Sequence, residues 1–357
     1  MADNSFCDIL NNQSNVFTQN HMEEIQMYFD LSGLWQADIG DGKVYPMQLP
    51  GTLDENRIGH KDLGQNQWHP DAALGNAEEG FDENAPIATR FTRKYTFEGE
   101  ARLTRRISFT PEEGKRVFLE AERVRYLRLL VDGKEVPHFS EGSLSTPHVF
   151  EVTGLLNGDN EITLLSDNSY PGLPHDAIVY SSAATDETQT NWNGVLGYLR
   201  LRVEEPVFLS ALRIYPDRDG ETLTVQAEVS ADRFWSGTLL VESGALKKEK
   251  SGAQEYAGYQ KKICVQPGLT RFVLEKLPLA GDVRRWDEEE GNLYELTARL
   301  SAKERQELAS RTETFGVRTF GDNGKGRLAL NGRVIFLRSE ANCCEFPETG
   351  HPPMTVE

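Results

Sequence analysis

The turns of this chain constrain its fold more than any other feature. From Tyr28 onward, short runs of alternating apolar and polar residues are separated by glycines and by Asn-Gly and Asp-Gly pairs. These pairs tolerate the positive φ that a two-residue hairpin loop needs, and an alternation with period two is typical of a half-buried strand. In one example, the run LRLLV at residues 127–131 leads directly into Asp132 and Gly133. The pattern predicts an all-β protein built from antiparallel strands.

The length and punctuation of the chain predict more than one domain. A chain of 357 residues can form two ordinary cores and begin a third. Residues 1–27 are polar and rich in Asn and Gln, so we expect a flexible N-terminal arm. Pro206 separates two blocks of strands, which places a domain boundary near residue 205. The second block continues to about residue 316 with the short strands and frequent turns of a small β-sandwich.

Charge and composition exclude some classes of partner. The chain has 38 Lys and Arg residues against 56 Asp and Glu residues, which gives a formal net charge of -18. Such a field repels nucleic acid and anionic membrane surfaces, so we expect neither as a partner. No window approaches the roughly 18 uninterrupted apolar residues of a membrane span. The first Lys or Arg is Lys43, so no basic segment precedes an apolar one as in a secretory signal.

The four cysteines are scattered and do not suggest a disulfide framework. They are Cys7, Cys264, Cys343 and Cys344. The adjacent pair could bridge only with strain, and its spacing to nearby acidic residues and histidine matches no zinc pattern. We therefore expect reduced thiols in a cytoplasmic protein, with no metal and no cofactor.

Several motifs, taken in order, resemble those of the family 2 glycoside hydrolases. The segment DLSGLWQADIG resembles the Leu-X-Gly-X-Trp opening of that family's jelly-roll sugar-binding domain, and LPGTLDENRIG resembles its Pro-Gly-Thr loop. The segment NWNGVLGYLRL is similar to the stretch that closes the same domain. Finally, TFGVRTF followed by LALNGRVIFLRSEANCCEFPETG is similar to the junction where a β-sandwich leads into a (β/α)8 barrel. The resemblance covers about residues 28–357.

This resemblance implies a domain order and a chemistry. Residues 28–205 would form the jelly-roll, galactose-binding-like domain, residues 206–316 an immunoglobulin-like β-sandwich, and residues 317–357 the beginning of a truncated TIM barrel. The family hydrolyses glycosides by double displacement with two barrel glutamates, one acting as acid/base and one as nucleophile. In family members both glutamates lie well beyond the position of residue 357, so we name no catalytic residue in this chain.

The resemblance also implies where a sugar would bind. In the family, the end of the jelly roll reaches over the barrel mouth, and TQTNWNGVLG occupies that place here. Asn191 and Asn193 could bond vicinal hydroxyls, and Trp192 could stack on a pyranose face. The alternative is an Asx-type turn with Trp192 as a core residue. The upstream residues Asp167, Asn168 and Tyr170 could line the same cleft, but they fit a solvated loop better.

The first barrel strand differs from that of better-known family members. These carry Arg-Gly-X-Asn-X-His-Glu, whereas this chain has Ser339 at the Gly position and Cys343 at the His position. A thiol is a poor substitute for imidazole as a hydroxyl partner, which indicates a divergent branch rather than β-galactosidase or β-glucuronidase specificity. Barrel active sites lie at the C-terminal ends of strands, so with the barrel in place Asn342, Cys343, Cys344 and Glu345 are predicted to face substrate, and without it to be exposed.

Three functional hypotheses follow from these observations. The first is the non-catalytic N-terminal region of a retaining exo-glycosidase, which positions a terminal sugar of an oligosaccharide or glycoside. The second is a stand-alone carbohydrate-binding module without hydrolase activity. The third is a structural adhesion protein built from two sandwiches, which would show no sugar binding. The sequence leaves the sugar, the linkage and the formation of a homo-oligomer open.

Overall fold

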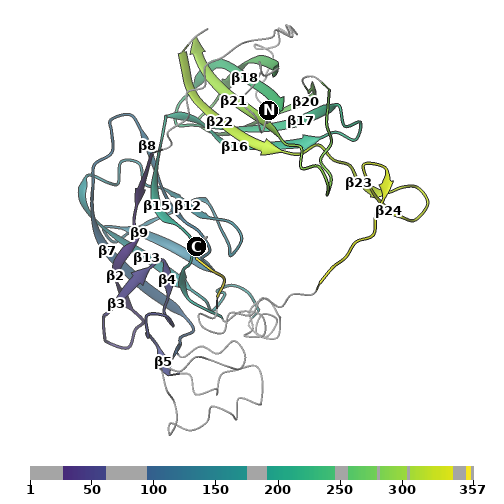
Figure 1. Cartoon of the computed structure of the whole chain (residues 1–357). Helices are drawn as coiled ribbons and strands as arrows, with labels where there is room; N and C mark the ends of the chain where they lie inside the picture. The colour runs from purple at the N-terminus through teal and green to yellow at the C-terminus, as the bar shows by residue number, and fades with distance from the viewer. Residues whose placement is uncertain are drawn as a thin grey trace. The chain divides into compact units, whose positions relative to one another are not determined.

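Figure 1 presents the computed structural model of the chain, which describes residues 27–61, 95–174, 191–245, 256–279, 282–303, 306–340 and 351–354. Every regular element in these ranges is a β-strand, so the all-β prediction is confirmed. None of them is a helix that could cross a membrane. The described residues divide into two compact units, one within residues 27–203 together with residues 351–354 and the other within residues 204–339. The predicted N-terminal arm lies, apart from Met27, outside the described residues. We name the strands β1 to β15 the first sandwich and β16 to β22 the second sandwich.

The first sandwich consists mainly of two antiparallel sheets. The six-stranded sheet has the order β10 (Lys134–Val136), β9 (Tyr126–Val131), β13 (Gly158–Asp167), β7 (Glu100–Phe109), β2 (Gly33–Asp38) and β3 (Tyr45–Leu49). The five-stranded sheet has the order β1 (Met27–Asp30), β15 (Leu199–Glu204), β8 (Arg116–Ala121), β12 (His148–Glu151) and β11 (His138–Ser140). In the six-stranded sheet, Leu164 lies opposite both Leu103 and Leu129, and all three are fully buried. The predicted alternation of residues 127–131 therefore faces the core.

The opening motif DLSGLWQADIG has a direct physical role in this sandwich. Leu31 and Trp35 are buried, and the Trp35 indole nitrogen donates to the Leu31 carbonyl at 3.0 Å. Arg105 Nη1 donates to the carbonyls of Leu31 and Ser32, both at 2.8 Å. Gly33 has φ of +128°, and a Cβ there would lie 3.3 Å from Arg105 Nη1. A side chain at residue 33 would therefore disturb the arginine that holds the motif.

Two short strand pairs complete the first sandwich. β4 (Gly51–Thr52) pairs with β14 (Gly194–Val195), and β5 (His60–Lys61) pairs with β6 (Tyr95–Thr96). The first pair connects the Pro-Gly-Thr loop to the Asn-Trp-Asn-Gly stretch through antiparallel strand pairing.

The second sandwich packs a three-stranded sheet with a four-stranded sheet. The first has the order β16 (Val207–Pro216), β17 (Thr222–Ala231) and β20 (Gly268–Pro278). The second has the order β19 (Tyr256–Val265), β18 (Trp235–Ala245), β21 (Tyr294–Lys303) and β22 (Gln306–Phe315). The alternating residues Leu223, Val225, Ala227 and Val229 of β17 are fully buried, which confirms the period read from the sequence. They share one core with Leu296, Ala298 and Leu300 of β21.

A small hairpin sheet follows the second sandwich. It contains β23 (Phe320–Asp322), β24 (Leu328–Leu330) and β25 (Arg333–Val334). Asn331 adopts φ of +52° in its turn, donates from Nδ2 to the Trp286 carbonyl at 2.9 Å, and accepts the Thr319 amide at 3.0 Å. The Trp286 amide donates to the Val317 carbonyl at 2.8 Å. These bonds tie the hairpin to the edge of the sandwich from which it emerges.

The five-stranded sheet of the first sandwich contains one deeply buried histidine. His148 is 1% exposed, and its Nδ1 accepts the Gly142 amide at 3.3 Å. The neutral ring therefore carries its proton on Nε2, which lies 3.2 Å from the Val124 carbonyl. Burial lowers the pKa of His148 to about 4, although the Val124 carbonyl opposes this effect.

We predict that His148 makes the first sandwich sensitive to mild acid. The unfolded chain binds a proton at this residue below its ordinary pKa of 6.5, whereas the folded chain does so only near pH 4. The free energy of unfolding should therefore fall as the pH decreases through this window, by at most about 3 kcal/mol from this residue. Urea unfolding across the window should show a shallower pH dependence in His148→Gln than in the parent chain. An NMR titration of His148 with a midpoint near its ordinary pKa would contradict the prediction.

Candidate functional site

Two loops of the first sandwich meet where the sequence predicted a sugar-binding segment. We name residues 191–194 the Trp192 loop and residues 51–56 the Gly51 loop. In the β4–β14 pair, Gly194 lies opposite Thr52, and the Leu53 amide donates to the Asn193 carbonyl at 2.9 Å. Gly194 has φ of +137°, and a Cβ there would lie only 2.3 Å from the Gly51 carbonyl oxygen. The close approach of the two loops therefore requires glycine at position 194.

Asn193 holds the Trp192 loop against the six-stranded sheet. Its side chain is 4% exposed, and Oδ1 accepts a hydrogen bond from the Ser166 hydroxyl at 2.7 Å. Nδ2 donates to the Gly99 carbonyl at 2.9 Å and to the Ser166 carbonyl at 3.2 Å. Both the oxygen and the nitrogen of this amide thus make hydrogen bonds within the protein, and these bonds hold the loop in its conformation.

Asn168 and Asn191 form a second set of amide contacts beside it. Asn168 Nδ2 donates to the carbonyls of Phe97 and Asn191, both at 2.8 Å, and Oδ1 accepts the Gly99 amide at 2.9 Å. In return, Asn191 Nδ2 donates to the Asn168 carbonyl at 3.1 Å. The interpretation of Asp167 and Asn168 as a solvated loop is wrong, because they are 8% and 0% exposed. Hydrogen bonds to the Asn168 amide and the Asp167 carboxylate offset the cost of burying these polar groups. The sequence alone did not reveal these partners.

Trp192 lies at the centre of a cluster with one cation and one phenol. Its side chain is 3% exposed, and the guanidinium carbon of Arg125 lies 4.7 Å from its ring centroid. Arg125 Nε donates to the Trp192 carbonyl at 2.9 Å, and Nη1 donates to the Tyr170 hydroxyl. Tyr170 adopts φ of +55°. The cation therefore connects two aromatic side chains that are distant in sequence.

The indole nitrogen of Trp192 is the exceptional atom of this cluster. It is buried, and within the described part of the chain it has no hydrogen-bond acceptor. A buried donor left without an acceptor destabilises a protein by about 1–3 kcal/mol, so such groups are uncommon unless they serve a ligand or a water molecule.

The structure brings together some of the predicted site residues, whereas others lie outside the described residues. Asn191, Trp192 and Asn193 lie together at the meeting of the two loops, but their role in substrate binding stays a prediction. Asn342, Cys343, Cys344 and Glu345 lie outside the described residues. Sequence reasoning missed Arg125, which no local motif marks, because its partners come from segments 45 and 67 residues away.

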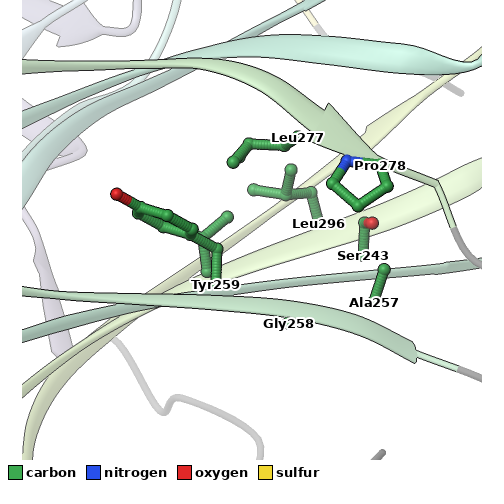
Figure 2. A pocket seen from close by; sticks show the side chains of 8 residues that line it. Ser243, Ala257, Gly258, Tyr259, Leu277, Pro278 and Leu296 are labelled. Carbon is green, nitrogen blue, oxygen red and sulfur yellow. The ribbon is translucent and has the colours of Figure 1, made fainter. Parts of the chain in front are cut away.

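The second sandwich contains a pocket of a different kind. It is lined by Val241, Ser243, Ala257, Gly258, Tyr259, Leu277, Pro278 and Leu296, and Figure 2 shows these side chains between the strands of the two sheets. Its free volume is about 10 Å³, which is room for roughly one water molecule. A sugar ring does not fit there. Within the described ranges, no group of three or more His, Cys, Asp or Glu side chains is placed to hold a metal ion.

The second sandwich also matches a known protein family. Residues 207–318 match the sequence model described as "Glycosyl hydrolases family 2". Over these residues the chain is similar to that family. The resemblance to family 2 that the motifs suggested is therefore confirmed. No curated protein sequence matches the chain.

Several solved structures share the fold of the described strands. The beta-glucuronidase of Bacteroides uniformis is 18% identical with a TM-score of 0.61, and the match covers 86% of this chain and 34% of that chain. A beta-galacturonidase of Eisenbergiella tayi, bound to galacturonate, is 19% identical with a TM-score of 0.56, covering 87% and 46%. A family 2 member of Bacteroides cellulosilyticus is 14% identical with a TM-score of 0.57, covering 86% and 38%. The chain thus spans between a third and a half of the length of these three structures.

We predict that the Asn193 amide is essential for the stability of the first sandwich. Asn193→Asp would place a carboxylate oxygen against the Gly99 and Ser166 carbonyls, which now accept the Nδ2 protons, and should lower the free energy of unfolding by about 3 kcal/mol. Chemical denaturation at neutral pH measures this loss. The matched control is Asn323→Asp, because the Asn323 side chain only accepts, from the amides of Lys325 and Arg327. Equal stability changes in the two variants would contradict the prediction.

Proposed function

We propose that this chain is the N-terminal, non-catalytic region of a retaining exo-glycosidase, and that its Trp192 loop helps to position the terminal sugar of a glycoside. The family 2 match of residues 207–318 supports the reaction class. Family 2 hydrolysis uses two carboxylates on either side of the glycosidic bond. The similar structures, among them a beta-glucuronidase and a beta-galacturonidase, are two to three times as long as the part that matches. A longer enzyme with its carboxylates in the remaining part accounts for this difference.

The single observation that carries the substrate-positioning role is the convergence of donors at Trp192. The buried indole N–H, the Arg125 guanidinium and the Tyr170 hydroxyl lie in one cluster. The Tyr170 oxygen accepts from Arg125 and keeps its own proton to donate. Hydroxyl and ring oxygens of a sugar are acceptors for such groups. A rigid set of donors held by buried amides suits recognition of an oxygen-rich ligand.

The hairpin after the second sandwich supports the presence of a further domain. Phe320, Phe336 and Leu337 are 56%, 87% and 53% exposed. Large apolar side chains gathered in one short segment are usually covered by another surface. A finished carbohydrate-binding module has no need for this segment, so the observation favours the glycosidase hypothesis over the stand-alone module.

We predict that the purified 357-residue chain does not hydrolyse glycosides. A panel of nitrophenyl glycosides, including uronides, should give no release of nitrophenol above the uncatalysed rate, because the two catalytic carboxylates are expected elsewhere. Turnover of any member of the panel by the purified chain would overturn this assignment of the catalytic groups.

The proposal as a whole is tested by reading the gene past the codon for Glu357. An open frame of several hundred codons with two glutamates at barrel strand ends supports it, and an immediate stop codon contradicts it. Saturation-transfer NMR with methyl glycosides then separates the two carbohydrate hypotheses. Binding by the chain alone at roughly millimolar affinity or better favours the stand-alone module. No binding together with a stop codon leaves the adhesion hypothesis.

For a complete enzyme, we predict that Trp192→Phe raises KM about five- to tenfold. The substitution keeps the ring beside Arg125 but removes the indole N–H, and one hydrogen bond to a bound sugar corresponds to about 1 kcal/mol. Steady-state kinetics on a nitrophenyl glycoside measures the change. The KM of Trp192→Leu, which removes the ring as well as the N–H, is measured under conditions where both variants are folded. The difference in KM between the two variants then gives the contribution of ring packing, separate from that of the hydrogen bond. An unchanged KM in Trp192→Phe would show that the indole N–H does not contact substrate.

A further inference from the structure

A short segment near the end of the chain is bound to the first sandwich. Residues 351–354 contact the Gly51 loop and the connection between β8 and β9. His351 is 1% exposed, and its Nε2 lies 2.9 Å from Glu55 Oε2. Arg123 Nη1 donates to the Pro353 carbonyl at 2.8 Å. The segment is therefore attached at two points, by one ion pair and by one hydrogen bond from an arginine.

The surroundings of the His351 ring determine its charge. Nδ1 lies 2.7 Å from the Pro352 carbonyl oxygen, and Nε2 faces the Glu55 carboxylate. Both partners can only accept hydrogen bonds. A neutral imidazole carries one N–H, so one of the two nitrogens would direct a lone pair at an acceptor oxygen. The imidazolium form satisfies the Nδ1 contact and places a positive charge against the Glu55 carboxylate.

The charged groups around the ring favour the same form. Glu55 and Asp54 face His351 from the Gly51 loop, and Arg123 faces the segment from the β8–β9 connection. Burial opposes a charge on His351, but the Glu55 carboxylate, the Pro352 carbonyl and Asp54 outweigh it and raise the pKa of His351. Burial likewise opposes the charge on Glu55, yet His351 and the donors of Thr52 hold the pKa of Glu55 below its ordinary value.

Glu55 connects this ion pair to the candidate site. Its Oε2 accepts the Thr52 amide at 3.1 Å, and the Thr52 hydroxyl accepts the Glu55 amide at 3.1 Å. Thr52 is the β4 residue opposite Gly194, and the next amide, that of Leu53, donates to the Asn193 carbonyl. The chain of contacts from His351 to the Trp192 loop is thus continuous, and each of its links is a hydrogen bond, a strand pair or an ion pair.

We propose that His351, as an imidazolium, is a positioning residue that clamps residues 351–354 onto the Gly51 loop, and that loss of its proton releases this segment and loosens the Trp192 loop. Below the ordinary histidine pKa of 6.5 the clamp is fully closed, and it opens as the pH rises through the raised pKa of the folded state. The inference does not depend on the proposed glycosidase function, because it concerns contacts within the first sandwich.

The test follows three NMR signals of the whole chain through a pH titration. These are the His351 ring carbon, the Met354 methyl group and the Leu53 amide. Met354 reports on the segment and Leu53 on the contact between the two loops. The expected result is a single shared midpoint above the ordinary histidine pKa of 6.5, with Met354 and Leu53 moving together with the ring. A His351 midpoint at or below its ordinary value, or a Met354 signal that does not respond, overturns the proposal.

Variants distinguish the clamp from a general effect of pH. In His351→Gln, the Met354 and Leu53 signals should occupy their high-pH positions throughout the titration. In Glu55→Gln, the His351 midpoint should fall below that of the parent chain, because the carboxylate that stabilises the cation is gone. His60→Gln, which changes an exposed histidine, is the matched control. It should leave the midpoints of all three titrations the same as in the parent chain. If the Met354 transition persists in His351→Gln, another group causes that transition and the proposal is overturned. If a variant fails to fold, the titration of the parent chain decides the test.

Discussion

The contact between Gly51 and Gly194 is the constraint on which the candidate site depends. Because a Cβ at residue 194 would lie 2.3 Å from the Gly51 carbonyl oxygen, two loops separated by about 140 residues can pair only through glycine. This pairing sets the positions of Asn193 and Thr52 on either side of it. Asn193 then anchors the Trp192 loop to the six-stranded sheet, and Thr52 bonds Glu55, which meets His351. One close backbone approach therefore organises both the Trp192 cluster and the ion pair.

The polar interior around this contact is stable because nearly every buried group has a partner. Asn168 and Asn193 are buried amides whose donors and acceptors are used by neighbouring backbone and hydroxyl groups. Such a network fixes side-chain positions more tightly than apolar packing would, since each amide satisfies its bonds in one orientation only. Against this background the indole N–H of Trp192 is a buried donor that has no acceptor among the described residues. A site that is rigid around one available donor is better suited to orient a ligand than a mobile loop would be.

The strands could be predicted from the sequence, whereas the chemistry of the site could not. Alternation in β17, from Leu223 to Val229, is a local pattern that burial enforces, and the turn glycines mark its ends. Arg125, His148 and His351 have no such local signature, because their environments are created by residues far away in the chain. The wrong interpretation of Asn168 has the same origin, since a polar Asp-Asn-Ser run is typical of a solvated loop until its distant partner Asn191 is known. Motif order identified the family, but only geometry separates the asparagine that holds the loop from the tryptophan that can serve a ligand.

The second sandwich shows how the same family motifs can have a purely structural purpose. Gly316 leaves space for Trp286, since a Cβ there would lie 3.1 Å from the Trp286 Cβ, and Asn331 bonds the Trp286 carbonyl. The Phe-Gly and Leu-Asn-Gly motifs therefore fix the position at which the chain leaves the sandwich and the direction of the hairpin that follows. The exposed side chains of Phe336 and Leu337 lie directly beyond this fixed exit. The bonds of Asn331 and the space left by Gly316 therefore determine where these exposed apolar side chains are presented.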